Sequence, residues 1–183
     1  MIAEGMTIVE VASVGIRWPE RLRHLRPKNV LELGTGQGAS GAQIMSALAP
    51  DAVFTTVNYA DGHVFGEQLS EWYTDARLTR VSADTLSRAT LDMVPDGVDL
   101  MFIDTTHEAW HAAEELTLWQ DKLQDGAIVV LDDLDQHDMQ EFWDSIPYEK
   151  ATQERQGVFR YDAAVRYEGR FDRPEKTTYG GST

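Results

Sequence analysis

The stretch Val30–Ser40 reads VLELGTGQGAS and combines three local patterns in a short span. Its first residues are apolar and predict a buried strand, and Ala39–Leu48 has the composition of a helix. Between them stand Gly34, Gly36 and Gly38, which leave no side chain between the backbone and a ligand. The pattern predicts a ligand-binding turn between a strand and a helix. An ordinary tight turn is the alternative.

The spacing of the glycines indicates which ligand to expect. A dinucleotide-binding turn has G-x-G-x-x-G with an acidic residue about 20 positions later. This chain has G-x-G-x-G, and Glu32 stands two residues before the first glycine. The pattern resembles the first motif of class I S-adenosylmethionine-dependent methyltransferases, E/D-x-G-x-G-x-G. The resemblance implies S-adenosylmethionine as cofactor, with Glu32 ordering the turn and reaching the cofactor's ammonium. The turn residues that it implies as cofactor-binding are Glu32, Gly34, Thr35, Gly36 and Gly38.

Length and composition limit the class of protein. With 183 residues, 42% of them hydrophobic, the chain is expected to form one domain over residues 1–165, followed by a loose polar tail over 166–183. No stretch approaches the roughly 18 apolar residues of a membrane span, and the first residues lack a signal peptide's pattern. We therefore expect a soluble, cytoplasmic protein with no membrane partner. The absence of cysteine excludes disulfides, thiolate metal sites and a cysteine nucleophile.

The charge balance bears on the partner. The chain has 31 acidic and 16 basic residues and a net charge of −15, which repels phosphate backbones. A nucleic-acid substrate is therefore not expected, and a small-molecule substrate is. The alternative is that the charge only keeps the protein soluble.

Strand patterns alternate with helix patterns along the chain, as is typical of a parallel sheet covered on both faces. The predicted strands cover residues 30–33, 52–58, 78–82, 98–104 and 127–132. The predicted helices cover residues 18–26, 39–48, 65–73, 85–92, 106–123 and 137–145. The β-branched and aromatic residues of 148–165, interrupted by Gln156-Gly157, predict a closing hairpin. We therefore expect a doubly wound, Rossmann-like α/β fold with an antiparallel edge hairpin.

Carboxylates follow two of the buried strands. Asp104 ends the strand over 98–104, and Asp132 and Asp133 stand at the end of the strand over 127–132. Ligands of open parallel sheets bind beyond the carboxyl ends of the strands. Carboxylates gathered there repel one another unless a cation or protons intervene, and their oxygens suit Mg²⁺, Mn²⁺ or Ca²⁺. A solvated, inert acidic loop is the alternative for Asp132 and Asp133.

The pieces Asp104-x-x-His107 and Asp132-Asp133, separated by a helix, carry a second resemblance. They are similar to the site of metal-dependent small-molecule O-methyltransferases, of the catechol type and of the group near cephalosporin hydroxylase. The resemblance covers about residues 28–135. It implies a seven-stranded methyltransferase core and a small-molecule hydroxyl acceptor. It also implies that Asp104, Asp132 and Asp133 hold the divalent cation, and that His107 and Asp104 are catalytic, His107 as general base.

Four further positions bear on the cofactor. Where the family has an acidic residue for the ribose hydroxyls, this chain has Asn58, so Asp61 is an alternative for that role. The resemblance places Asp84 at the adenine amino group, and a helix N-cap is its alternative. Tyr59 is expected either to stack on the adenine or to lie in the core. Asp104 also counts among the implied cofactor contacts.

A competing motif is present, because residues 107–111 read H-E-x-x-H. On one helix face, His107 and His111 would bind Zn²⁺ with Glu108 as general base, as in a metallopeptidase. Against this, Thr105 and Glu108 have the spacing of a capping box that opens a helix. We therefore favour a structural role for Glu108 and a position on the helix surface for His111.

We expect an S-adenosylmethionine-dependent enzyme that transfers methyl, with a divalent cation, to a small-molecule hydroxyl. The alternatives are the zinc metallopeptidase and a methyltransferase-like domain that binds without catalysis. About 27 residues precede the first core strand, too few for a large lid. The acceptor is therefore expected to be covered by a small segment, by a neighbouring subunit of a homo-oligomer, or by nothing.

Overall fold

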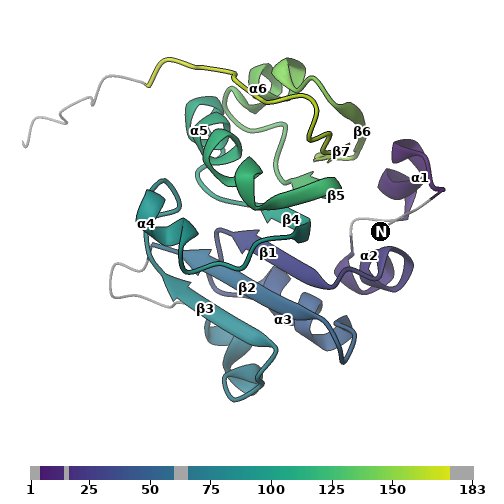
Figure 1. Cartoon of the computed structure of the whole chain (residues 1–183), viewed down its shortest axis with the longest axis vertical. Helices are drawn as coiled ribbons and strands as arrows, with labels where there is room; N and C mark the ends of the chain where they lie inside the picture. The colour runs from purple at the N-terminus through teal and green to yellow at the C-terminus, as the bar shows by residue number, and fades with distance from the viewer. Residues whose placement is uncertain (1–4, 15–16, 60–65, 174–183) are drawn as a thin grey trace, which may run out of the picture.

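The computed structural model describes residues 5–14, 17–59 and 66–173, which form a seven-stranded sheet with helices on both sides (Figure 1). The strands lie in the order β3-β2-β1-β4-β5-β7-β6. Strands β1 to β5 are parallel, whereas β7 is antiparallel to both β5 and β6. The strands are β1 (Asn29–Leu33), β2 (Val53–Asn58), β3 (Leu78–Ser82), β4 (Val98–Ile103), β5 (Leu123–Leu131), β6 (Glu149–Gln153) and β7 (Gln156–Arg160). The predicted fold class and edge hairpin are confirmed.

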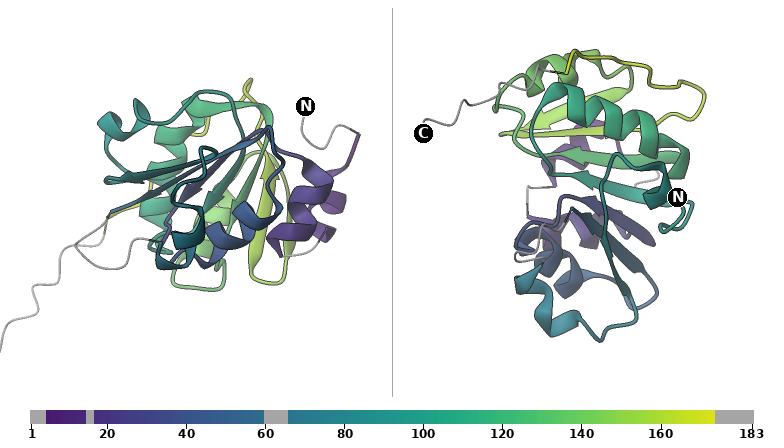
Figure 2. Two further views of the ribbon diagram at one scale, coloured as in Figure 1. Left: turned by 90° about the horizontal axis from the view of Figure 1, so that it is seen from below. Right: turned by 90° about the vertical axis from the view of Figure 1, so that its left-hand side faces the viewer.

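The helices are divided between the two faces of the sheet (Figure 2). One face carries α1 (Ile8–Ser13), α2 (Trp18–Leu25), α3 (Ala39–Ala47) and the 3₁₀ segment η1 (Glu67–Trp72). The other face carries α4 (Arg88–Leu91), α5 (Ala109–Trp119), the short η2 (Gln120–Lys122) and α6 (Met139–Ser145). The sequence predicts neither α1 nor the 3₁₀ geometry of η1, because both are short and their packing decides them.

Successive side chains of a strand point to opposite faces of the sheet, which explains why a hydrophobic core lies on each face. In β1, Leu31 and Leu33 pack with α5 and α6, whereas Val30 packs with α2 and α3 on the opposite face. Every residue of β4 is buried, which is expected of a central parallel strand covered on both sides. The central strands are therefore packed on both faces, and the residues that follow them at the carboxyl edge are held in position by this packing.

The helix after β4 begins later than the sequence predicts. We expected it to start near Thr106, with Thr105 and Glu108 as a capping box, but α5 starts at Ala109 and Glu108 makes no side-chain cap. The Thr105 hydroxyl instead donates to Glu115, 2.9 Å away. The Ala109 amide donates to the Asp138 carboxylate at 2.8 Å, so a distant residue caps the helix. The capping-box prediction is wrong because tertiary partners satisfy these groups.

The expectation of a loose tail after residue 165 is wrong for its described part. Tyr167 is buried in the core, and its backbone amide and carbonyl both bond the Gln120 side chain. Its hydroxyl lies 2.9 Å from that of Ser145. The packing of Tyr167 in the core and these hydrogen bonds hold this segment against the domain, while residues 174–183 lie outside the described residues.

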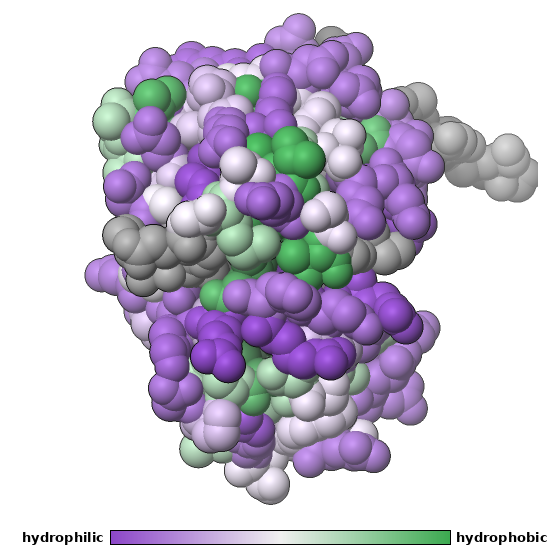
Figure 3. Space-filling view, turned by 90° about the vertical axis from the view of Figure 1, so that its right-hand side faces the viewer, coloured by the Kyte–Doolittle hydropathy of each residue, from purple (hydrophilic) through white to green (hydrophobic). Residues whose placement is uncertain are grey.

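No helix in the described ranges is long and apolar enough to cross a membrane. Seen from the side of α1 and α2, the surface is mostly hydrophilic, with separate hydrophobic patches near its middle (Figure 3).

Candidate active site at the carboxyl edge of the sheet

A pocket of about 950 Å³ opens at the carboxyl ends of the central strands. The sequence-predicted residues that line it are Gly34, Thr35, Gly36, Asn58, Tyr59, Asp84, Asp104 and Asp132. Residues for which the sequence predicts no place in this pocket also line it: Arg17, Trp18, Thr85, Phe102, Thr105, His111, Arg155 and Gln156. The pocket volume is at the upper end of the ~300–1,000 Å³ range of small-molecule sites.

The glycines of the turn have different functions. A Cβ on Gly34 would lie 1.9 Å from the Asp104 carbonyl oxygen, so this glycine lets the turn after β1 touch the end of β4. Gly36, which lines the pocket, has a φ of +48° and nothing within 4 Å of its Cβ position. Gly34 is therefore required by the fold, whereas Gly36 leaves open space for a ligand to approach the backbone.

Glu32 lies behind the turn and does not line the pocket. It is fully buried, and its carboxylate accepts hydrogen bonds from the hydroxyls of Ser40 and Thr56, the latter at 2.5 Å. Thr56 is also bonded to Thr35, so Glu32 ties β1, β2, the turn and α3 together. Burial raises the pKa of Glu32 to about 7, although both hydroxyls oppose the shift. The predicted ordering of the turn by Glu32 fits this arrangement.

The remaining predicted cofactor residues stand at the ends of β2 and β3. Tyr59 is 67% exposed and lines the pocket, which is incompatible with the core position considered for it. The Asp84 carboxylate accepts from the Leu86 amide at 2.9 Å, so it closes a turn before α4 while lining the pocket. Asn58 lines the pocket, and Asp61 lies outside the described residues.

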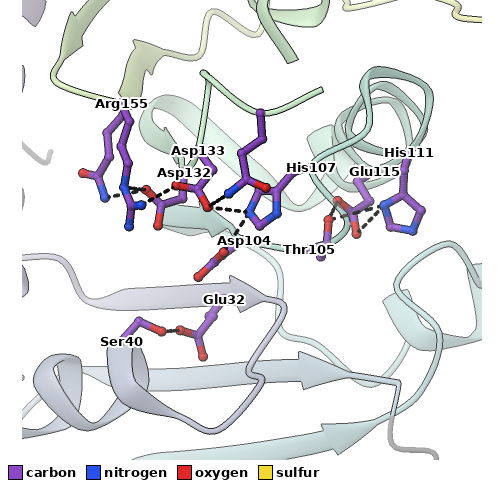
Figure 4. Close-up of polar contacts among 12 residues, drawn as sticks. Glu32, Ser40, Asp104, Thr105, His107, His111, Glu115, Asp132, Asp133 and Arg155 are labelled. Atoms are coloured by element: carbon purple, nitrogen blue, oxygen red, sulfur yellow. Dashed lines mark hydrogen bonds and ion pairs between the residues drawn. The ribbon is translucent and has the colours of Figure 1, made fainter. Parts of the chain in front are cut away.

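Asp104 and His107 form a contact at the end of β4 (Figure 4). His107 Nε2 lies 3.1 Å from Asp104 Oδ1 and 3.7 Å from Asp133 Oδ2. The hydrogen bond with Asp104 raises the pKa of His107, and burial opposes the shift. His107 and Asp133 also have φ values of +53° and +52°, and such strained backbone is concentrated at functional sites. The sequence prediction that these residues gather is confirmed, with Asp104 facing the pocket.

Asp132 and Asp133 face a side chain from the turn between β6 and β7. Arg155 Nη1 lies 2.9 Å from Asp133 Oδ1, and Arg155 Nε lies 3.8 Å from Asp132 Oδ1. Gln156 Nε2 donates to Asp132 Oδ1 at 3.2 Å. Burial, and after it the charge of Asp104, raises the pKa of Asp132.

The three carboxylates do not fit the divalent cation that the sequence analysis predicts. One oxygen of each carboxylate is already engaged by a side chain, Asp104 by His107, Asp133 by Arg155 and Asp132 by Gln156. In the described ranges, no group of three or more histidine and acidic residues could hold a metal ion. The alternative of a solvated, inert acidic loop is also wrong. Asp132 is half-buried, Asp133 is buried, and both form ion pairs with Arg155.

The H-E-x-x-H motif lacks the geometry of a zinc peptidase. His107 lies before α5 and Glu108 is its N-cap, so the two histidines do not share a helix face. His111 is buried rather than on the surface. Its Nδ1 lies 3.4 Å from the fully buried Glu115 and 3.3 Å from the Thr105 hydroxyl. Burial opposes ionisation, but Glu115 outweighs it and raises the pKa of His111.

Comparison with known proteins identifies the family and the fold of the chain. A family model described as a methyltransferase domain matches residues 31–134. No curated protein sequence matches the chain. Among solved structures, the methyltransferase PaMTH1 of Podospora anserina, bound to S-adenosylhomocysteine, has a TM-score of 0.64 at 15% identity, over 83% of this chain and 76% of that one.

Two further structures share the fold. A Staphylococcus aureus protein assigned as a caffeoyl-CoA O-methyltransferase has a TM-score of 0.64 at 16% identity, over 85% of this chain and 84% of its own. The O-methyltransferase TomG of Streptomyces achromogenes, in complex with S-adenosylmethionine, has a TM-score of 0.54 at 20% identity, over 73% of this chain and 68% of its own. At these identities the structures show a common fold.

Proposed function

The chain belongs to the methyltransferase-domain family, and on that basis we propose that it transfers a methyl group from S-adenosylmethionine to a hydroxyl of a small molecule. The observation that carries the proposal is one pocket lined by both the glycine turn and Asp104, with His107 bonded to Asp104. The two O-methyltransferases of similar fold support a hydroxyl acceptor. The net charge of −15 disfavours nucleic acid.

The cofactor fits the side of the pocket at the turn after β1. Gly36 leaves its backbone open, and Glu32 holds the turn from behind. Tyr59, Asn58 and Asp84 line the pocket further along, where the ribose and adenine are expected. When bound, S-adenosylmethionine supplies a methyl group on a positively charged sulfur, so the protein's main task is to orient the two reactants in line.

The acceptor is expected beside Asp104, where Trp18 and Phe102 form an apolar wall with ring centroids 4.8 Å apart. As the hydroxyl oxygen bonds to the methyl carbon and the carbon–sulfur bond breaks, the hydroxyl proton must leave. Asp104 faces the pocket and receives this proton in our proposal, and His107 behind it holds it because its pKa is raised.

Cofactor binding is tested by calorimetric titration of the chain with S-adenosylhomocysteine. Gly36→Ala is expected to weaken binding at least about tenfold, because its methyl group occupies the space of the ligand. Gly126→Ala is the matched control. Gly126 also has a positive φ and open space around its Cβ position but lies outside the pocket, so it reports backbone strain alone. Equal affinity for both variants would place the cofactor elsewhere.

Catalysis is tested separately, with labelled S-adenosylmethionine and a panel of hydroxyl-bearing small molecules. Methylation of at least one acceptor, lost in Asp104→Ala, is the expected result. Tight binding of S-adenosylhomocysteine without methylation of any acceptor would instead favour the non-catalytic binding domain.

A further inference from the structure

Acidic and basic side chains from four parts of the fold meet beside the pocket. We call them the charge cluster: Asp104, Asp132, Asp133, His107, Arg155 and Arg21. The acidic members follow β4 and β5, whereas the arginines come from the β6–β7 turn and from α2. Figure 4 shows Arg155 and His107 directed at the carboxylates from two sides.

Arg155 is held in place by backbone as well as by charge. The Leu134 amide donates to the Arg155 carbonyl at 2.8 Å, which ties the hairpin turn to the loop after β5. Asp132 and Asp133 have side chains only 13% and 12% exposed, although Arg155 is itself 57% exposed. Isolated surface ion pairs contribute little because both partners are mobile and solvated. This pair differs, since its acidic partners are desolvated and the backbones are joined.

Arg21 brings a second guanidinium group near Asp132, to which it is linked through the Gln156 side chain. It is fully buried, and its Nη1 donates to Gln156 Oε1 at 3.0 Å, while Gln156 Nε2 donates to Asp132 at 3.2 Å. Its Nε and Nη2 have no hydrogen-bond partner among the described residues. Burial lowers the pKa of Arg21 to about 10 and Asp132 opposes the shift, so the group is charged at neutral pH. A buried charge needs a compensating one, and Asp132 supplies it.

We propose that the charge cluster takes the electrostatic place of a divalent cation, so that this site excludes Mg²⁺ and Mn²⁺. A divalent cation requires carboxylates free to turn toward it, and here the His107 imidazole, the Arg155 guanidinium and the Gln156 amide already engage them. A cation entering this space would also meet the two arginines. The consequence that methyl transfer proceeds without metal rests on the proposed function, whereas the exclusion of the ion does not.

The exclusion is tested by titrating the whole chain with Mn²⁺ at neutral pH and measuring free Mn²⁺ by electron paramagnetic resonance. The parent is expected to bind with a Kd of about 1 mM or weaker. Arg155→Gln keeps a hydrogen-bonding group but removes the charge, so Mn²⁺ affinity should rise about tenfold or more. Arg155→Lys restores the charge and should behave like the parent.

Arg166→Gln is the matched control, because Arg166 is a half-exposed arginine paired with Asp121 away from the pocket. It should leave Mn²⁺ binding unchanged. Micromolar Mn²⁺ binding by the parent, or an affinity that Arg155→Gln does not raise, would overturn the proposal. If no acceptor is methylated while Mn²⁺ is still excluded, the proposed function fails and the charge cluster stands.

Discussion

Glu32→Gln is expected to remove a pH dependence of stability that the parent protein carries. Glu32 is fully buried, and burial raises its pKa from 4.5 to about 7 in the folded chain. Between these values the folded protein holds a proton that the unfolded chain has released. Stability from this group is therefore fully present below the unfolded pKa and is lost as pH rises through the folded pKa. Glutamine has no proton to lose there.

The size of the effect follows from the shift. Each pH unit between the two pKa values removes about 1.4 kcal/mol from the free energy of unfolding, so the full shift is worth about 3 kcal/mol. Between about pH 5 and pH 8 the expected loss is about 2.5 kcal/mol, because both ends of the titration lie partly outside this interval. This is a large part of a typical domain's stability of ~5–15 kcal/mol.

The assay is urea unfolding of the parent and of Glu32→Gln at several pH values across this interval. Subtracting the two free energies cancels all other titrating groups. The difference in free energy of unfolding between parent and variant should change by about 2.5 kcal/mol, because the parent becomes less stable relative to the variant as pH rises. The variant Glu71→Gln removes an exposed carboxylate and should show a constant difference. A constant difference for Glu32→Gln as well would refute the reasoning that burial keeps this carboxyl protonated.

Three further outcomes are expected. Gly34→Ala should destabilise the fold by about 3 kcal/mol or more in urea unfolding, because its Cβ would lie 1.9 Å from the Asp104 carbonyl oxygen. His107→Gln should slow methyl transfer by about 10² to 10⁴ without changing the Kd for S-adenosylhomocysteine. The parent rate should rise with pH through the raised His107 pKa, and a variant with the same profile would exclude His107 as proton holder. Glu115→Gln should lower the pKa of His111 in an NMR titration, and an unchanged pKa would mean that Glu115 is not its partner.

Sequence pattern was sufficient for the fold and for the position of the site. The apolar run before Gly34 and the buried strand ending at Asp104 are local patterns, and a parallel sheet brings the carboxyl ends of its strands to one edge. The glycine turn, Asp104 and Asp132 were therefore predicted to lie together, and the pocket contains them. The resemblance to methyltransferases rests on these same residues.

Local motifs gave wrong predictions where residues elsewhere in the fold supply stronger hydrogen-bond partners. Thr105 and Glu108 have the spacing of a capping box, but Thr105 bonds Glu115 and a residue from another loop caps α5. His111 was expected on the helix surface, whereas the buried Glu115 draws it inward. A capping box is worth about 1 kcal/mol, which a few tertiary hydrogen bonds exceed.

The sequence by itself determined the individual strands, the glycine turn and the acidic residues at the ends of two strands. Only the tertiary structure decided what neutralises those acids. Arg21 stands on a helix before β1 and Arg155 on a hairpin turn near the end of the domain, so nothing in their spacing links them to Asp132. They meet because β7 pairs antiparallel with β5 and because α2 packs against one face of the same sheet. Charge attraction acts through space rather than along the chain, and for that reason the sequence predicted a metal where the fold supplies guanidinium groups.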